Sequence, residues 1–205
     1  MKSMYIGSGD VHALLMGRNT DGHQKLLRRF VSGEKPRYNA KASPIDALRV
    51  GAILEERYFI TLGENFYSQY VVTSKEMNVL KCSLDFAELK DGEVINFEEL
   101  KTCNFNDFLL FEQFRNNYDG AINYIKKYYK SNYNQIQEQL YCTELQSAYL
   151  VFLAVYSYDD EENYIREIKS NEYIKFNIFR DDAVISEIKE RAKIFQALKD
   201  YYETA

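Results

Sequence analysis

Two carboxylates and an amine in the middle of the chain have types and spacing that suit chemistry at a metal ion. Asp85 stands in one apolar segment, and Glu99 and Lys101 flank Leu100 in the next. On a β-strand, alternation places Glu99 and Lys101 on the same face. Carboxylate oxygens are ligands that suit Mg²⁺ or Mn²⁺, and a nearby ammonium can orient a metal-bound water or help to deprotonate it. These side chains suit hydrolysis of a phosphodiester bond.

The Glu-x-Lys pattern alone is a weak signal, because this chain contains it four times. An isolated pair of this kind is usually an exposed charge pair on a strand. The pair Glu99 and Lys101 is the one that falls inside an expected strand directly after a strand that carries an Asp. The chemistry therefore depends on whether Asp85 reaches the same sheet face as Glu99.

The turn between these two strands decides that relationship. A two-residue turn at Asp91-Gly92 would pair Lys90 with Glu93, and Asp85 and Glu99 would then lie on opposite faces. A three-residue loop that includes Lys90 would make Glu99 a diagonal neighbour of Asp85 on the same face. We predict the three-residue loop, or a β-bulge with the same effect.

Two helical motifs add candidate residues. Gly51 and Glu55 are spaced i,i+4, so Gly51 would allow a close backbone approach and Glu55 would add a third carboxylate. Gln137 and Tyr141 have the same spacing; a Gln amide can hold a phosphate or a metal-bound water, and a Tyr ring can pack on a sugar or base. The competing interpretations are an exposed Glu on an amphipathic helix and a solvent-facing polar helix.

The elements that must position these residues form an α/β (α+β) domain with a central sheet flanked by helices. Helices are expected over 8–16, 21–31, 43–62 (with Ser43-Pro44 at its start), 105–114, from 120 or 131 to 143, and after Asp181-Asp182. Strands are expected over 66–73, 78–86, 94–103 and 148–156, with a further hairpin over 164–168 and 173–179.

The 205 residues (24.2 kDa) suit a single domain of ordinary soluble composition, with 46% hydrophobic and 28% charged residues. The longest apolar run, Ala148–Tyr156, is too short to cross a membrane, and the first ten residues have no apolar signal core. We therefore expect no membrane association and a cytoplasmic location. The three cysteines Cys82, Cys103 and Cys142 form no CxxC pair and are expected to be free buried thiols.

The net charge of −5 is unevenly distributed. Residues 1–60 hold 10 Lys and Arg against 6 Asp and Glu, whereas the rest of the chain is acidic. A polyanion could bind the basic N-terminal part, although solvated helix faces explain the same excess.

The ordered set Gly-x-x-x-Glu, Asp, Glu-x-Lys and Gln-x-x-x-Tyr resembles the PD-(D/E)xK nuclease superfamily. Within it, the chain looks like the YqaJ-like viral recombinases, which include the lambda-type phage exonucleases and the RecB nuclease domain. The segment Ser8 to Gly17 resembles the opening helix of that branch, and the likeness covers roughly residues 8–156. It implies a restriction-endonuclease-like mixed β-sheet, with a helical N-terminal part (1–63), a catalytic core (64–156) and a C-terminal hairpin and helix (157–205).

The resemblance also implies roles for individual residues. Asp85, Glu99 and the backbone carbonyl of Leu100 would be metal ligands, with Glu55 as an additional carboxylate and Lys101 as the catalytic lysine.

Further roles would concern the nucleic acid. Gln137 would position DNA or water, and Tyr141 would contact DNA. Ser8, assisted by Arg18 or Arg28, would anchor a 5′-phosphate.

Two differences from the family pattern matter. Phe86 stands where many members have Gly after the metal-binding Asp. The backbone after Asp85 therefore need not have the turn shape of those members. Three cysteines cannot supply the four that an iron–sulfur branch of the family needs.

The function implied is a Mg²⁺- or Mn²⁺-dependent deoxyribonuclease that degrades duplex DNA from its 5′ ends during recombination or end processing. A single-strand annealing protein would be its partner, a ring-shaped homotrimer its assembly, and the bacterial or phage-infected host cytoplasm its location. The alternatives are a structure-specific or restriction-like endonuclease of the same fold and a non-catalytic DNA-end-binding protein. The presence of Lys101 argues against the last alternative.

Overall fold

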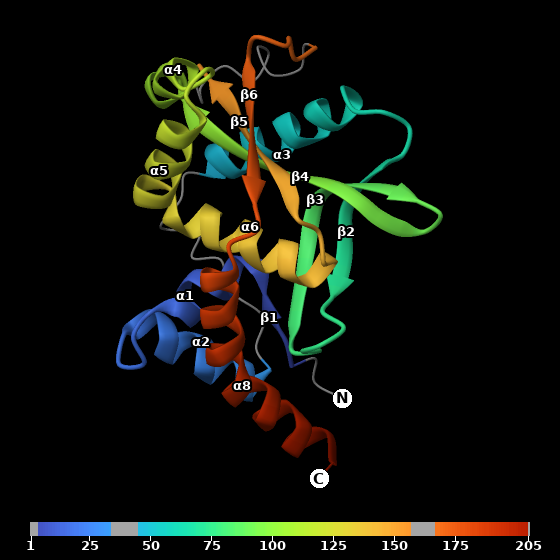
Figure 1. Cartoon of the computed structure of the whole chain (residues 1–205), viewed down its shortest axis with the longest axis vertical. Coiled ribbons are helices and arrows are strands. Elements are labelled where there is room, and N and C mark those ends of the chain that lie inside the picture. The colour runs from blue at the N-terminus through green and yellow to red at the C-terminus, as the bar shows by residue number, and fades with distance from the viewer. Residues whose placement is uncertain (1–3, 34–44, 157–166, 205) are drawn as a thin grey trace.

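The structure is a computed structural model that describes residues 4–33, 45–156 and 167–204 (Figure 1). Its helices are α1 (Val11–Leu15), α2 (Asp21–Ser32), α3 (Ile45–Ile60), α4 (Phe105–Gln113), α5 (Tyr118–Tyr128), α6 (Lys130–Thr143) and α8 (Asp182–Thr204). A short 3₁₀ turn (Ser8–Asp10) precedes α1. The strands are β1 (Ile6–Gly7), β2 (Phe66–Thr73), β3 (Leu80–Lys90), β4 (Glu93–Asn104), β5 (Ser147–Val155) and β6 (Tyr173–Phe179).

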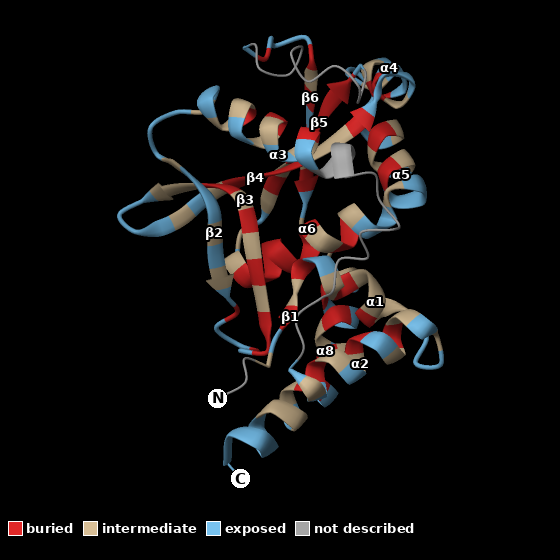
Figure 2. Cartoon of the chain, turned by 180° about the vertical axis from the view of Figure 1, so that it is seen from behind, coloured by how far each residue is buried: buried red, intermediate tan, exposed pale blue. Residues whose placement is uncertain are grey.

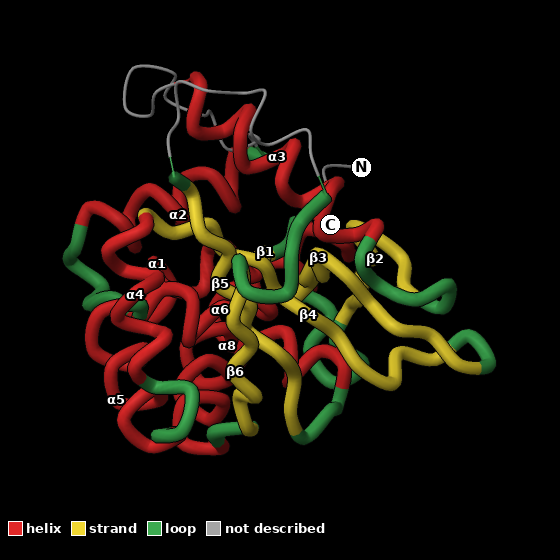
Figure 3. The backbone as a smooth tube through the Cα atoms, turned by 90° about the horizontal axis from the view of Figure 1, so that it is seen from above, coloured by secondary structure: helices red, strands yellow, loops and turns green. Residues whose placement is uncertain are grey.

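These strands form one mixed six-stranded sheet. Its order is β1-β3-β4-β5-β6, and β2 pairs with β3 outside this path. The pairs β1–β3 and β4–β5 are parallel, and the other neighbours are antiparallel. With helices on both sides of the sheet (Figure 3), the expected α/β class with a central mixed sheet is confirmed.

Helices α3 and α6 cover opposite faces of the sheet, and the strands alternate between them. Val151 of β5 packs with Leu54 and Tyr58 of α3, whereas its neighbour Phe152 packs with Ile136 in the larger core beneath α6. Figure 2 shows that buried stretches run along both β3 and α6. Because α6 lies directly on this sheet face, its polar side chains can reach the strands.

The N- and C-terminal helices pack together beside α6. Phe30 of α2 meets Phe195 of α8 edge to face, with 5.0 Å between ring centroids. Ile188 and Ala192 continue the buried side of α8 that the apolar spacing predicts.

Two expected elements differ in the structure. Of the two starts expected for the helix that ends at Thr143, the one at 131 matches α6, and α5 is a separate helix because Tyr129 leaves helical geometry between them. The first helix begins as a 3₁₀ turn at Ser8. The predicted pairing of 164–168 with 173–179 is wrong for its described part: residues 167–168 are not in a strand, and β6 pairs with β5.

β5 is an apolar strand, and β6 provides its second neighbour in the sheet beside β4. Ile174, Phe176 and Ile178 of β6 are buried in the core. The expected helix start at Ser43-Pro44 and residues 164–166 lie outside the described residues. None of the described helices has the length and hydropathy required to cross a bilayer.

Candidate active site

The turn of the β3–β4 hairpin differs from the predicted loop. Lys90 pairs with Glu93, so the turn contains two residues, Asp91 and Gly92. Both have positive φ, at 54° and 84°, which is the conformation of a tight hairpin turn that Asp-Gly favours. The three-residue loop is therefore wrong.

A β-bulge restores the relationship between the two carboxylates. Leu89 pairs with Val94, but Glu88 pairs with Asn96, so Ile95 has no partner on β3. The pairing then continues to Phe86 opposite Glu98. One further step in this register sets Asp85 opposite Glu99, so the bulge that was the alternative prediction is present.

The Asp85 side chain bridges β3 and β4 where their backbone pairing ends. Its Oδ2 accepts a hydrogen bond from the backbone N–H of Leu100 at 2.9 Å. Burial and the negative charge of Glu99 raise the pKa of Asp85 well above its ordinary value, against the opposing effects of Lys101 and the Leu100 N–H. A cation bound next to Asp85 would offset its negative charge and so stabilise the ionised carboxylate.

Glu99 is fully buried and is held by three donors. Lys101 Nζ and Gln135 Nε2 donate to Oε1 at 2.6 and 2.5 Å, and Gln139 Nε2 donates to Oε2 at 2.6 Å. Gln139 Nε2 also donates to the backbone carbonyl of Ser83 at 3.2 Å. These bonds fix both carboxylate oxygens of Glu99 between β4 and α6.

Sequence reasoning missed Gln135 and Gln139. The signal was present as a second i,i+4 pair on the same helix, interleaved with Gln137 and Tyr141. Gln137 lies two positions from both Gln135 and Gln139 and therefore points to the other side of the helix. Only one of the two i,i+4 pairs can face Glu99.

Lys101 remains a cation in this cluster. Burial works to lower the pKa of Lys101, but the negative charges of Glu99, Asp85 and Glu55 outweigh it and raise that pKa above the ordinary value. The ammonium therefore serves as a hydrogen-bond donor and a positive charge at neutral pH.

Glu55 of α3 lies at the edge of the same cluster. It is partly exposed, it contributes to the raised pKa of both Asp85 and Lys101, and its Oε1 accepts from Gln69 Nε2 at 2.5 Å. Gln69 lies in the middle of β2 with a φ of 52°, an uncommon left-handed conformation in a strand. Apart from the neighbouring backbone of α3 itself, no described atom lies within 4 Å of the Cβ position of Gly51, so the close backbone approach expected there is not made by the described chain.

Gln137 and Tyr141 lie away from the carboxylates, which corrects the expected role of Gln137 at the metal site, whereas a contact of Tyr141 with DNA stays a prediction. The Gln137 amide donates to the carbonyl of Phe179 at 3.0 Å and accepts from the N–H of Asp181 at 2.7 Å. The Tyr141 hydroxyl donates to Glu76 at 3.1 Å. Both side chains face away from Glu99, and Gln137 ties α6 to the junction of β6 and α8.

The expected phosphate-binding residues lie in the N-terminal part. Ser8 is buried in the 3₁₀ turn, which packs against α6 and β3. Arg18 and Arg28 are exposed, whereas the nearby Arg29 forms an ion pair with Asp10. Their contact with a phosphate stays a prediction.

Phe86 explains why this hairpin needs no Gly after Asp85. Its ring is fully buried on the α3 side and stacks on Phe59 at 5.8 Å between centroids. The strand continues through Phe86, so the position is not a turn.

The donor set suits a hard divalent cation. Asp85, Glu99, Glu55 and the Leu100 carbonyl would offer oxygen ligands, as Mg²⁺ and Mn²⁺ prefer. Within the described chain, three carboxylates do not converge within 4.8 Å of one another here. Beside Glu99, however, the buried Oε1 of Gln139 has no hydrogen-bond partner, so it can accept from a water of a hydrated ion.

Comparisons with known proteins support the fold. No family model and no curated protein matches the chain. The solved alkaline exonuclease LHK-Exo from Laribacter hongkongensis is 18% identical, with a TM-score of 0.61 over 98% of this chain and 90% of that one, and it is also solved in complex with dAMP.

A phage-related exonuclease from Haemophilus somnus 129PT is 16% identical, with a TM-score of 0.63 over 98% of this chain and 95% of that one. Both similarities extend over nearly the whole chain. The chain therefore has the fold of the alkaline and phage-related exonucleases.

Proposed function

We propose that this protein is a metal-dependent deoxyribonuclease, a phage-type exonuclease that hydrolyses duplex DNA from its 5′ ends. The observation that supports it best is the buried Glu99, held by Lys101 and two glutamine amides beside Asp85. The fold shared with two exonucleases supports the same assignment.

Asp85, Glu99, Glu55 and the Leu100 carbonyl are the residues that would hold Mg²⁺ or Mn²⁺. When bound, the ion supplies Lewis acidity, which favours a nucleophilic water and offsets charge on the phosphate. The chain's own contribution is preorganisation: Gln135 and Gln139 fix Glu99 before substrate arrives.

Lys101 supplies a fixed positive charge next to the reacting phosphate. Its raised pKa keeps the ammonium protonated at neutral pH, so it donates hydrogen bonds to Glu99 and to an incoming water or phosphate oxygen. In this arrangement Lys101 positions and stabilises groups, and it is not the base that accepts the proton of the water.

The DNA path is assigned to the basic N-terminal part. Ser8, with Arg18 or Arg28, would receive a 5′-phosphate, in keeping with the excess of positive charge in residues 1–60. The resemblance also supports recombination or end processing as the process, a single-strand annealing protein as partner, a ring-shaped homotrimer and a location in bacterial or phage-infected cytoplasm.

Digestion of linear duplex DNA tests this function. One 5′-phosphate end carries a label, and Mg²⁺ is present or chelated with EDTA. We expect metal-dependent release of labelled mononucleotide from the 5′ end and no cutting of a covalently closed circle.

Rapid cutting of the closed circle would instead show an endonuclease. DNA-end binding with the same absence of cleavage in Mg²⁺, Mn²⁺ and EDTA would favour a binding protein over a nuclease.

A further inference from the structure

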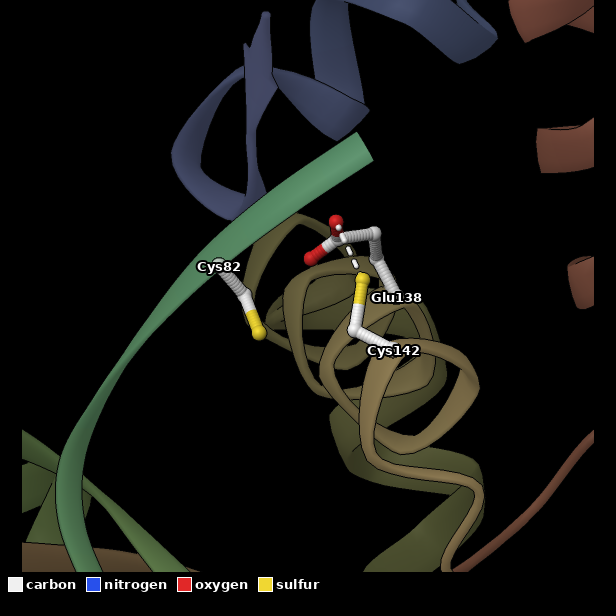
Figure 4. Close-up of side chains that lie close together, drawn as sticks. All are labelled: Cys82, Glu138 and Cys142. Carbon is white, nitrogen blue, oxygen red and sulfur yellow. Dashed lines mark hydrogen bonds between the residues drawn. The ribbon is translucent and has the colours of Figure 1, made fainter. Parts of the chain in front are cut away.

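A second group of possible metal ligands lies outside the carboxylate cluster. Cys82 of β3 and Glu138 and Cys142 of α6 each offer one ligand atom, and these three atoms lie within 4.8 Å of one another. All three residues are buried. Figure 4 shows their side chains converging between β3 and α6.

Glu138 is the unusual member of this group. It is fully buried, its Oε1 accepts from the Cys142 thiol at 3.1 Å, and its Oε2 has no hydrogen-bond partner. Burial raises the pKa of Glu138 to about 8. An acid in an apolar core with one weak thiol donor is costly, and an unpaired buried oxygen of this kind needs a compensating group.

The chemistry of the three side chains selects one class of ligand. Two thiolates favour a thiophilic ion and exclude Mg²⁺ as the preferred occupant, because Mg²⁺ takes oxygen ligands. Zn²⁺ accepts Cys sulfur together with carboxylate oxygen. Two sulfur atoms and both oxygens of Glu138 would provide four donor atoms, including the oxygen that has no partner.

We propose that Cys82, Glu138 and Cys142 form a binding site for a thiophilic divalent ion of the Zn²⁺ type, distinct from the carboxylate site. Binding forms two metal–sulfur bonds and one bond to each carboxylate oxygen of Glu138. The two thiol protons and the carboxyl proton leave to solvent, so no oxidant or reductant is required.

The position of this site gives it a structural role. Asp85 follows Cys82 by three residues on β3, and Gln139 directly follows Glu138 on α6. An ion at the site would cross-link the strand that carries Asp85 to the helix that holds Glu99. It would also stabilise the native state, since the unfolded chain does not preform the site.

Cobalt substitution tests the proposal. The protein is produced in minimal medium containing Co²⁺, purified under reducing conditions, and its absorption and cobalt content are measured. Thiolate-bound Co²⁺ has a sulfur-to-metal charge-transfer band in the near ultraviolet, whereas Co²⁺ with oxygen ligands alone lacks that band. We expect the band in the wild-type protein and its loss in Cys82→Ser and Cys142→Ser.

Cys103→Ser is the matched control. Cys103 is also a buried thiol, but its Sγ lies 3.7 Å from the Leu153 carbonyl and outside the cluster. The band should persist in Cys103→Ser and in Glu99→Gln, because neither Cys103 nor Glu99 supplies a ligand atom to this group. An unchanged band in Cys82→Ser and Cys142→Ser, or no band in the wild-type protein, would overturn the proposal.

X-ray absorption spectroscopy of the zinc-loaded wild-type protein supplies a measurement that needs no variant. We expect two sulfur neighbours and carboxylate oxygen around Zn²⁺. A shell of oxygen and nitrogen without sulfur, or a Cys82–Cys142 disulfide detected by mass spectrometry, would refute the site. Neither result depends on cleavage of DNA, so this proposal can fail while the nuclease assignment stands.

Discussion

Gln139 of α6 donates its side-chain amide to Glu99 of β4 at 2.6 Å, inside the core. This bond fixes a candidate metal ligand from a different element. Removing such a supporting hydrogen bond typically reduces metal affinity or activity by about 10- to 100-fold. We expect Gln139→Ala to lower cleavage by about that factor and to raise the Mg²⁺ concentration needed for half-maximal rate, as measured by a metal titration of the cleavage rate.

Gln137→Ala is the matched control on the same helix. Its amide holds the β6–α8 junction and does not contact Glu99. This variant should lower the thermal unfolding midpoint while leaving the Mg²⁺ requirement near that of the wild-type protein. The same Mg²⁺ shift in both variants would show that Gln139 acts only through stability.

Lys101 and Lys90 offer a test of position, because each follows a Glu by two residues on the same hairpin. Lys101 is next to buried Glu99, whereas Lys90 is exposed at the turn. Loss of a charged group that stabilises a transition state costs about 100- to 1,000-fold in rate. We expect that loss for Lys101→Ala and an unchanged rate for Lys90→Ala in single-turnover cleavage assays. Equal rates for both variants would remove Lys101 from the mechanism.

The raised pKa of Asp85 predicts how cleavage depends on pH. A carboxyl that must be ionised to bind a cation will release its proton at a higher pH than an ordinary Asp, because Asp85 is partly removed from water and lies beside Glu99. Activity should therefore rise with pH on the acid side. Since the proton and the cation compete for Asp85, the midpoint of that rise should move to lower pH as Mg²⁺ is increased.

Rates measured at several fixed Mg²⁺ concentrations check this linkage. Circular dichroism at each pH controls for unfolding. A midpoint that does not move with Mg²⁺ would mean that Asp85 is not the competing group.

The strands and carboxylates could be predicted from sequence because their signals are local. Residues 66–73 form β2 as expected, and Glu99 and Lys101 share a face by simple alternation. The bulge could not be predicted in detail, because Val94 and Ile95 are both apolar and the pattern does not show which of the two lacks a partner. The position of the bulge depends on two constraints at once, namely the two-residue Asp-Gly turn and the pairing of β4 with β5.

The orientation of α6 was also beyond sequence reasoning. This helix is buried nearly all round, and its buried residues include Asn134, Gln137, Glu138 and Gln139. An amphipathic helix reveals its inward side through an apolar stripe, but α6 has no such contrast. Tertiary packing alone therefore determines which glutamines face Glu99.

Glu98 provides a prediction about stability on the other side of the sheet. It is buried, and it accepts from the Tyr58 hydroxyl at 2.5 Å and from Lys175 Nζ at 2.7 Å. Tyr58→Phe removes one donor to a buried charge and should cost about 1–3 kcal/mol in the free energy of unfolding. Urea denaturation measures this cost. Cleavage at a temperature where both proteins are folded should be little affected, and a large loss of rate would extend the active site to this face.

Ile95 is the extra residue that brings Glu99 to the face of Asp85 despite the two-residue turn. Deleting Ile95 while the Asp91-Gly92 turn is kept removes the bulge but leaves Glu88 opposite Asn96, so Asp85 and Glu99 stay on one face. We therefore expect the deletion variant to keep most of its cleavage, in contrast to Lys101→Ala.

Ile95→Ala is the control for this deletion, because the side chain is 47% exposed and the bulge is kept. Its cleavage should remain within about two-fold of wild type, since surface substitutions of this kind usually change stability by no more than about 0.5 kcal/mol. Circular dichroism and thermal unfolding establish that the deleted protein is folded. Loss of cleavage to the level of Lys101→Ala in a folded deletion variant would show that the bulge itself, and not only the register beyond it, positions Glu99.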